Sequence, residues 1–289
     1  INCPLPSTVS ASRIAISMLA GSGESPNEGH FRPIEVVTRT GSMFHPLPPA
    51  PCFLYGWPAM QAMEAIYNAV SKAMPQLVPA CSGGDICALV WWGVREATGE
   101  PWADGSPHPV GQGASYRSDG ASSLLHVAEA ATRFSPTEVW EAKNPWLLEQ
   151  IELAPDSCGP GKYRGGLGIN MHFQMLEDCW VTAALERTKT PPWGLHGGGE
   201  AQANAGRLRH ADGRTSPFSK ATRLKVPKGA TLELSCGGGG GYGPPSERDP
   251  EQVFADLRDG YITEEHARHY YPHAFTTAAG DTGTSSQTS

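Results

Sequence analysis

One glycine-rich segment carries the residue types best suited to proton transfer. Residues 111–114 read Gly-Gln-Gly-Ala, and Asp119 and His126 follow. Small residues let a substrate approach the backbone, and carboxylates and imidazoles are the usual general acids and bases. The spacing indicates Asp119 and His126 as candidate catalytic base and acid, with Gln112 as a substrate-binding neighbour. An ordinary turn that Asp119 caps is the open alternative.

A second glycine-rich segment, residues 156–168, holds Lys162, Tyr163 and Arg164 among five glycines. Glycine is typical of positions that need a positive φ or a close backbone approach. A phosphate-binding loop would need G-x-x-x-x-G-K-[S/T] before a helix, but no Ser or Thr follows Lys162. The spacing G-x-G-x-x-G also fails by one residue. We predict a tight, rigid, basic loop joining two β-segments, with nucleotide binding as the open alternative.

The expected substrate-binding residues are Arg32, Asp85, Gln112 and Arg164. Arginine suits a carboxylate or a phosphate, because its planar guanidinium donates two parallel hydrogen bonds. Asp85 lies between Cys81 and Cys87, but nothing in the sequence marks either thiol as activated. We expect both cysteines to be small buried residues.

Three histidines near the C-terminus, His266, His269 and His273, are spaced three and four residues apart. One helical face could present them to a transition metal. Pro272 interrupts that helix, so a solvated helix is favoured and no metal is assigned to this chain. There is no H-E-x-x-H motif, and no G-x-S-x-G motif supports an α/β-hydrolase nucleophile.

Composition limits the classes of protein to which this chain can belong. The 289 residues are 39% hydrophobic and 18% charged, with a net charge of −7. The acidic balance argues against a nucleic-acid partner, and no apolar run approaches the length of a membrane span. The seven cysteines are odd in number without a C-x-x-C pair, which favours a reduced, cytoplasmic setting. The chain opens on Ile1 rather than methionine, so we expect residues to be missing upstream.

Periodicity predicts an α+β fold, rich in loops, Gly and Pro, with mixed or antiparallel sheets and a few helices. We expect a mixed α/β part over residues 1–150, with helices near 8–19 and 59–74. A mainly β part with short C-terminal helices is expected over residues 151–275, and a disordered tail over 276–289.

Several elements can be predicted individually. Residues 86–94 are almost wholly apolar and predict a buried strand, and residues 169–175 and 180–185 predict a strand pair that turns at Glu177 and Asp178. The remaining expectations are a β-type segment at 31–37, a long loop at 99–119, a helix at 121–131, short strands within 207–235, and helices at 250–257 and 263–271. The six-glycine segment 236–243 is either a close-packing turn or a mobile flap.

Seven motifs in order resemble a known family. They are residues 31–36, 46–51, 111–114 with Asp119-Gly120, 156–168, 191–199, 220–222 and 238–244. Together they are similar to the C-terminal half of the hydantoinase B/oxoprolinase family. That family includes the B-type subunits of ATP-dependent hydantoinases, 5-oxoprolinase, caprolactamase, and acetone or acetophenone carboxylases.

The resemblance implies a multi-subunit enzyme. An A-type subunit would bind ATP and Mg²⁺ and phosphorylate the substrate, and the B-type subunit would complete hydrolysis of a hydantoin or lactam ring, or carboxylation of a ketone. The family's divalent metal, Zn²⁺ or Mn²⁺, is expected in the N-terminal half of the B-type subunit, since this sequence has no counterpart to those motifs. The expected partners are therefore the A-type subunit, that N-terminal half, and a small cyclic amide or ketone. The alternative to an enzyme subunit is a structural half that holds the A-type and B-type subunits together and has no chemistry of its own.

Overall fold

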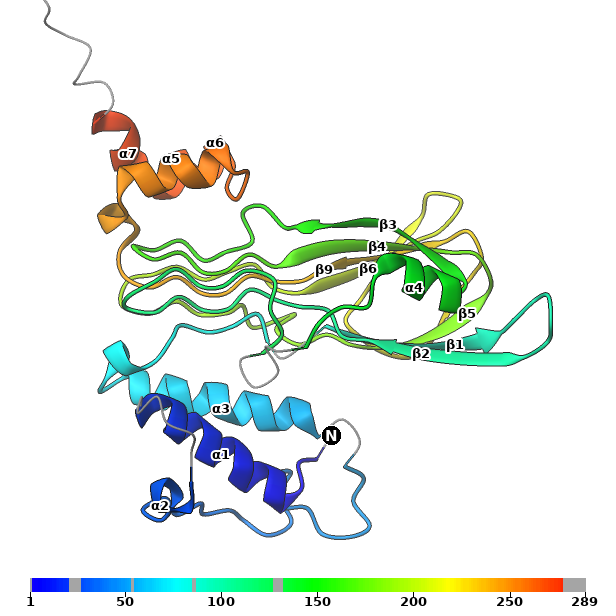
Figure 1. Cartoon of the computed structure of the whole chain (residues 1–289), viewed down its shortest axis with the longest axis horizontal. Coiled ribbons are helices and arrows are strands. Elements are labelled where there is room, and N and C mark those ends of the chain that lie inside the picture. The colour runs from blue at the N-terminus through cyan, green and yellow to red at the C-terminus, as the bar shows by residue number, and fades with distance from the viewer. Residues whose placement is uncertain (1, 21–26, 53–54, 85–86, 127–131, 278–289) are drawn as a thin grey trace, which may run out of the picture. The chain divides into compact units, whose positions relative to one another are not determined.

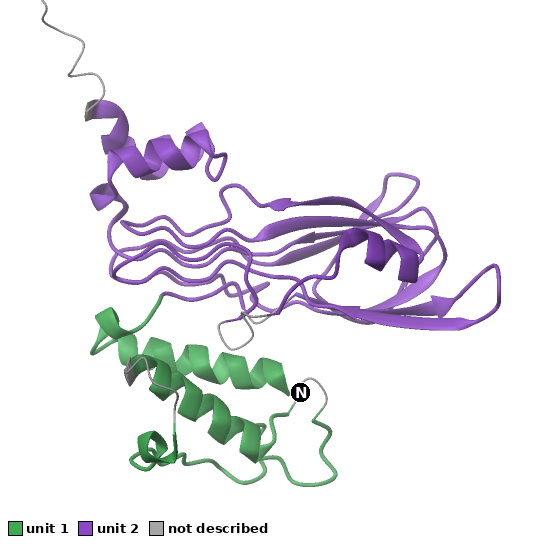
Figure 2. Ribbon diagram, in the orientation of Figure 1, with its two compact units in different colours: residues 1–79 green, residues 80–289 purple. Residues whose placement is uncertain are grey.

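The structure is a computed structural model that describes residues 2–20, 27–52, 55–84, 87–126 and 132–277 (Figure 1). The chain forms two compact units, Ile1–Pro79 and Ala80–Ser289 (Figure 2). Helices and antiparallel sheets both occur, so the α+β prediction is confirmed. Asp85 and most of the expected tail, residues 278–289, lie outside the described residues.

The first unit is built on two helices, α1 (Leu5–Ala20) and α3 (Gly56–Ser71), which pack against each other. Ala59, Met63 and Tyr67 are buried and spaced four residues apart, so they share one face of α3. The Tyr67 hydroxyl contacts the Met18 sulfur of α1 at 3.4 Å. These are the helices expected near residues 8–19 and 59–74. A short 3₁₀ turn, η1 (Pro75–Leu77), follows α3.

The β-type segment expected at residues 31–37 is wrong. Residues 28–31 form a short helix, α2 (Glu28–Phe31), whose N-cap Asn27 exchanges hydrogen bonds with His30. Residues 34–39 have no regular structure. A strand needs a partner for its backbone groups, and the described part of this unit contains no other strand.

The second unit contains two antiparallel sheets (Figure 1). The four-stranded sheet has the order β2-β1-β5-β8, made of Pro101–Ser106, Ala88–Val94, Cys179–Ala184 and Lys220–Val226. The five-stranded sheet has the order β3-β4-β9-β6-β7, made of Trp146–Leu153, Ile169–Met175, Thr231–Ser235, Ala205–Arg209 and Thr215–Phe218. Helix α4 (Thr137–Lys143) leads into β3.

The two sheets share one hydrophobic core. Strand β4 alternates buried and half-buried residues, and so does β5, so each strand has one face in the core. Trp91 of the four-stranded sheet contacts Trp146 and Phe173 of the other, with ring centroids 4.6 and 5.1 Å apart. Both predicted strands exist, but their predicted pairing is wrong. The turn at residues 177–178 carries the chain from one sheet to the facing one, so β4 and β5 meet through side chains.

Two further expectations are also wrong. Residues 101–106 within the expected long loop form β2, because they pair with the edge of β1, and their own sequence alternates only weakly. Residues 121–126 are not helical: Leu124 makes an isolated bridge to Val110 instead. The rest of that expected helix, residues 127–131, lies outside the described residues.

Beyond the strands, the second unit continues as a group of extended glycine-rich segments, which we call the glycine bundle. It comprises residues 80–84, 110–114, 118–124, 157–168, 192–204 and 236–243. These segments are drawn as wavy lines running side by side from the ends of the strands (Figure 1).

Segment 236–243 lies at the centre of the glycine bundle. The N–H groups of Gly239, Gly240 and Gly241 donate to carbonyls of residues 166, 81 and 199, at 2.9, 2.8 and 3.0 Å. Three consecutive donors thus reach three different neighbours. The direction of the N–H groups therefore rotates by about a third of a turn from one residue to the next. Such a rotation is typical of a polyproline II-type helix, which has three residues per turn and no internal hydrogen bonds.

The glycines of the bundle are required by close approach. A Cβ atom on Gly165 would lie 1.6 Å from the Gly239 carbonyl oxygen, and one on Gly113 would lie 1.8 Å from that of Ala80. Neither glycine has a positive φ. The predicted loop 156–168 does join two strands, β3 and β4, and it does so as part of this bundle.

Three short helices end the described chain: α5 (Pro250–Arg258), α6 (Glu264–Tyr270) and α7 (Pro272–Thr277), preceded by a 3₁₀ turn, η2 (Pro245–Glu247). Thr263 caps α6 by accepting from the His266 N–H. Val253, Ile262 and Tyr271 pack with Cys158 and Leu167 of the glycine bundle. The helices are thereby anchored on the bundle. No described helix combines the length and the hydropathy needed to cross a bilayer.

Candidate functional site

Two of the sequence-predicted site residues, the half-buried Asp119 and the buried Arg164, lie in an ion cluster with the buried residues Arg248 and Asp256. Arg248 donates to both carboxylate oxygens of Asp119, at 2.8 and 2.9 Å, and to Asp256 at 2.7 Å. Arg164 Nε donates to the other Asp256 oxygen at 2.9 Å, and its backbone N–H donates to Asp119. Two cations and two anions balance, so the cluster is neutral.

The cluster ties the C-terminal helices to the glycine bundle. Burial alone would lower the pKa of Arg248, but Asp119 and then Asp256 outweigh it and raise the pKa above its usual value. The pKa of Arg164 is raised in the same way, by Asp256 against burial. Only 1% of the Arg248 side chain and 9% of the Arg164 side chain is exposed. These two guanidiniums stay charged and bound to the aspartates. Their role is therefore to hold the C-terminal helices against the glycine bundle.

Gln112 contacts the backbone just before His126. Its Nε2 donates to the carbonyls of Leu124 and Leu125, both at 3.1 Å. His126 follows directly in sequence and is 1% exposed. Gln112 therefore fixes the backbone of residues 124–125, which form one wall of a pocket. Arg32 is exposed in the first unit, after α2.

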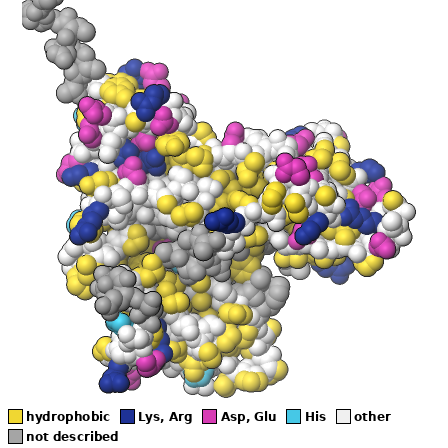
Figure 3. Space-filling model, viewed as in Figure 1, with side chains coloured by type: hydrophobic (Ala, Val, Ile, Leu, Met, Phe, Trp, Pro, Cys, Tyr) yellow, Lys and Arg dark blue, Asp and Glu magenta, His cyan; other side chains and the backbone are white. Residues whose placement is uncertain are grey.

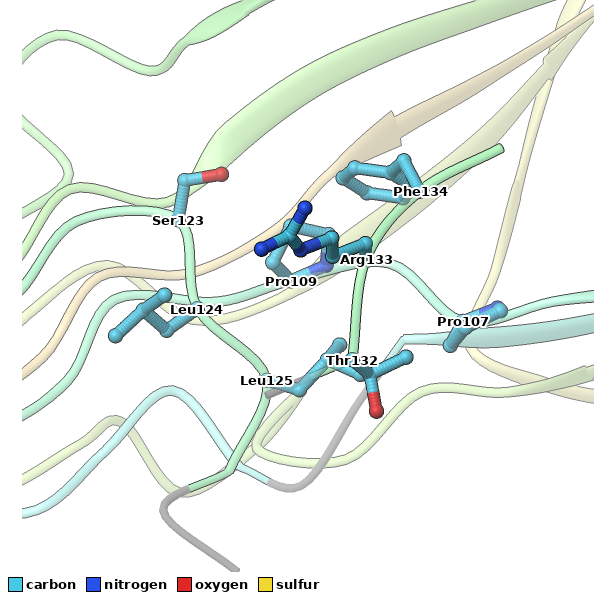
Figure 4. Close-up of a pocket in the computed structure, with 8 residues that line it drawn as sticks. All are labelled: Pro107, Pro109, Ser123, Leu124, Leu125, Thr132, Arg133 and Phe134. Carbon is cyan, nitrogen blue, oxygen red and sulfur yellow. The ribbon is translucent and has the colours of Figure 1, made fainter. Parts of the chain in front are cut away.

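The pocket lies in the second unit and has a volume of about 220 Å³. Its lining is mainly apolar, with three polar side chains, as Figure 4 shows: Pro107, Pro109, Leu124, Leu125 and Phe134, with Ser123, Thr132 and Arg133. Phe134 packs edge-on against Trp140 of α4, with ring centroids 5.6 Å apart. An apolar cavity with a few convergent polar groups is typical of a small-molecule site.

His108, between two prolines of the pocket lining, was not singled out from the sequence. Its Nδ1 donates to the Cys87 carbonyl, and its Nε2 has no hydrogen-bond partner among the described residues. Complete burial lowers its pKa to about 4, against the opposing effect of that hydrogen bond. His108 is therefore a neutral core side chain behind the pocket.

The remaining polar candidates do not form a metal centre. No group of three His, Cys, Asp or Glu side chains within the described residues could hold a metal ion. His266 lies 3.6 Å from the Asp156 carboxylate, and His273 Nε2 lies 2.7 Å from the Arg248 carbonyl. Cys81 and Cys87 are buried, as expected, and the pKa of Cys87 is raised by its contact with Cys236 and by burial.

Sequence reasoning missed Arg248 and Asp256 of the cluster and Ser123, Thr132 and Arg133 of the pocket. The one available signal was Pro107-His108-Pro109, an unusual rigid triplet beside the segments that were chosen. On the face drawn in Figure 3, cationic and anionic side chains are mixed over the sheets, without a face of a single sign.

Comparisons with known proteins agree with this architecture. The profile of the hydantoinase B/oxoprolinase family matches residues 1–245. A protein named as the B-type subunit of a D-/L-hydantoinase, from Pseudomonas sp. (strain NS671), is 31% identical over 83% of this chain and 40% of its own length. The acetophenone carboxylase delta subunit of Aromatoleum aromaticum is 30% identical over 72% of this chain and 36% of its own.

The fold also recurs in a solved structure. The crystal structure of the ATP-dependent caprolactamase from Pseudomonas jessenii superposes with a TM-score of 0.77, at 24% identity, over 91% of this chain and 47% of that one. The chain thus spans less than half the length of these relatives. Because the family profile covers most of its residues, the chain belongs to the hydantoinase B/oxoprolinase family.

Proposed function

We propose that this chain is the C-terminal part of a B-type subunit in an ATP-dependent amidohydrolase that opens a hydantoin or lactam ring. The observation that carries the proposal is the family match over residues 1–245, together with the 31% identity to the B-type subunit of a hydantoinase. The partners would be an A-type subunit, which binds ATP and Mg²⁺, and the N-terminal half of the B-type subunit, where a divalent metal is expected.

Phosphoryl transfer explains why such an enzyme uses ATP. A ring amide is a poor electrophile, and transfer of the γ-phosphoryl group to its carbonyl oxygen gives ADP and a phosphorylated ring with a good leaving group. Water then adds to that carbon, and the C–N bond breaks to leave an acyl phosphate and the protonated nitrogen. A second water hydrolyses the acyl phosphate, which releases inorganic phosphate. The products are a carboxylate and the freed nitrogen group.

The residues of this chain would position the substrate. Gln112 fixes the wall at residues 124–125, and the pocket would enclose the apolar substituent of the ring. His126 remains our proposal for a proton-transfer residue, and Arg32 and Asp85 for substrate-binding residues. Asp119 is engaged by Arg248 through two hydrogen bonds, so we propose that Asp119 and Arg164 act by holding the site segments in place.

A second candidate is a subunit of an ATP-dependent ketone carboxylase. It is favoured by the 30% identity to the acetophenone carboxylase delta subunit and by the apolar lining of the pocket, which would suit the body of a ketone. In that reaction bicarbonate would be consumed with the ketone.

Bicarbonate dependence separates the two candidates. The complex, reconstituted from this chain, the rest of the B-type subunit and the A-type subunit, is assayed with a hydantoin in buffer freed of carbon dioxide. We expect ADP and ring-opened product in equal amounts. ADP formation that requires both bicarbonate and a ketone would overturn the hydrolase in favour of the carboxylase.

A further inference from the structure

We propose that the pocket lined by residues 107–109, 123–125 and 132–134 binds a small carboxylate with a compact apolar body, and that Arg133 binds its charge. The identity of the natural ligand, a ring-opened product, rests on the proposed function. The chemical class of the ligand rests on the pocket itself.

The volume and lining favour a compact and largely apolar ligand. The cavity measures about 220 Å³, below the usual range of about 300–1,000 Å³ for sites that hold drug-sized molecules. Prolines, leucines and Phe134 make up most of the lining. No Asp or Glu is among its described lining residues.

One wall is fixed by hydrogen bonds on both sides. Val110 and Leu124 exchange backbone hydrogen bonds of 2.9 and 3.0 Å, and the Ser123 N–H donates to the Leu167 carbonyl at 2.9 Å. Ser123 has φ 54°, a left-handed conformation that costs a non-glycine residue about 1 kcal/mol or more. Gln112 adds two bonds to the same wall. Such a wall is preorganised, which reduces the entropy lost on binding.

The charge is provided by Arg133. In Figure 4 its side chain extends across the pocket toward the wall that carries Ser123 and Leu124. Within the described residues Arg133 has no hydrogen bond or ion pair, whereas both arginines of the ion cluster are paired with aspartates. Arg133 is exposed, and its guanidinium places a positive charge beside the apolar walls, which favours an anionic ligand.

The polar lining has the donors that a carboxylate needs. One guanidinium offers two parallel N–H donors, which match the two oxygens of a carboxylate. The hydroxyls of Ser123 and Thr132 are the other polar side chains of the lining. Hydrolysis of a ring amide creates such a group: water adds OH to the carbonyl carbon and H to the nitrogen, and the acid then loses its proton.

The test is a binding measurement on the full chain without nucleotide or partners. Phenylacetate is the probe. Phenylacetamide, which has nearly the same shape but no charge, is the control ligand. We expect phenylacetate to bind about tenfold more tightly, with amide chemical-shift changes at residues 123–125 and 132–134. Arg133→Gln should remove this preference, and Arg117→Gln, an exposed arginine elsewhere in the unit, should leave it unchanged.

Equal binding of the two probes, or a preference that survives Arg133→Gln in a variant with an unchanged urea midpoint, would overturn the carboxylate site. This result would be independent of the proposed function, since no turnover is measured. Conversely, the complex could fail to open rings while this chain still binds phenylacetate more tightly than phenylacetamide. That result would contradict the proposed function and would support the carboxylate site.

Discussion

At the residue scale, the ion cluster decides what two of the expected site residues do. Asp119 and Arg164 have the residue types expected of a substrate site, but their partners, Arg248 and Asp256, lie 129 and 92 residues further along the chain. No local pattern connects such positions. The sequence could therefore predict which polar residues lie near the glycine segments. It could not predict that Asp119 pairs with Arg248 and that Arg164 pairs with Asp256.

Loss of one cation from the cluster should be costly. We expect Arg248→Met to lower the free energy of unfolding by about 3–5 kcal/mol, because Asp119 and Asp256 would be left without their shared partner. Urea unfolding followed by tryptophan fluorescence measures this. Arg258→Met, on an exposed side chain of α5, is the control and should change stability by less than about 0.5 kcal/mol. Equal effects of the two changes would contradict a structural cluster.

His108 should make stability depend on pH. Its pKa is lowered to about 4 in the folded chain, so below its ordinary value of 6.5 the unfolded chain binds a proton that the folded chain does not. Stability should fall by about 3 kcal/mol as the pH drops from 6.5 to 4, and this contribution is fully present above pH 6.5.

Urea midpoints between pH 7 and pH 4.5 test this dependence. His108→Leu should flatten the slope, whereas His269→Gln, on an exposed residue, should leave it as it is. An unchanged slope in His108→Leu would show that other groups cause the loss.

At the element scale, the helices and most strands follow from periodicity, but the bundle does not. The apolar residues of α3 recur every four positions, and β4 alternates, so both were predictable. Polyproline II-type segments bury backbone rather than side chains, so they leave no hydrophobic period. For residues 236–243 the sequence left a packed turn and a mobile flap open, and the structure shows packing on several sides.

Substitution of a bundle glycine tests this packing. Gly165→Ala would place a Cβ 1.6 Å from the Gly239 carbonyl oxygen, and backbone on several sides prevents an easy shift. We expect a loss of about 3 kcal/mol or more, or a chain that does not fold. Gly105→Ala, in β2, is the matched control, because its nearest heavy atom lies at 3.9 Å. Thermal unfolding compares them, and similar midpoints would show that the bundle tolerates side chains.

At the scale of the whole molecule, this chain matches only part of the length of its relatives. It spans less than half of the relatives that it matches, and its described residues contain no cluster that could hold a metal ion. The glycine bundle, the ion cluster and the pocket wall are all fixed by internal contacts. Such a unit suits a rigid surface onto which the parts that bind ATP and metal would dock. The family could be predicted from the order of the motifs in the sequence. The substrate of this chain could not, because the glycine-rich motifs mainly make backbone contacts within the protein.

The most direct measurement is an omission series on ring opening. This chain, the rest of the B-type subunit, the A-type subunit, ATP and a hydantoin are combined, and each is left out in turn while ring-opened product and ADP are measured. We predict product only in the full mixture, with one ADP formed for each ring opened. Ring opening by this chain alone, without nucleotide or a second chain, would contradict the account.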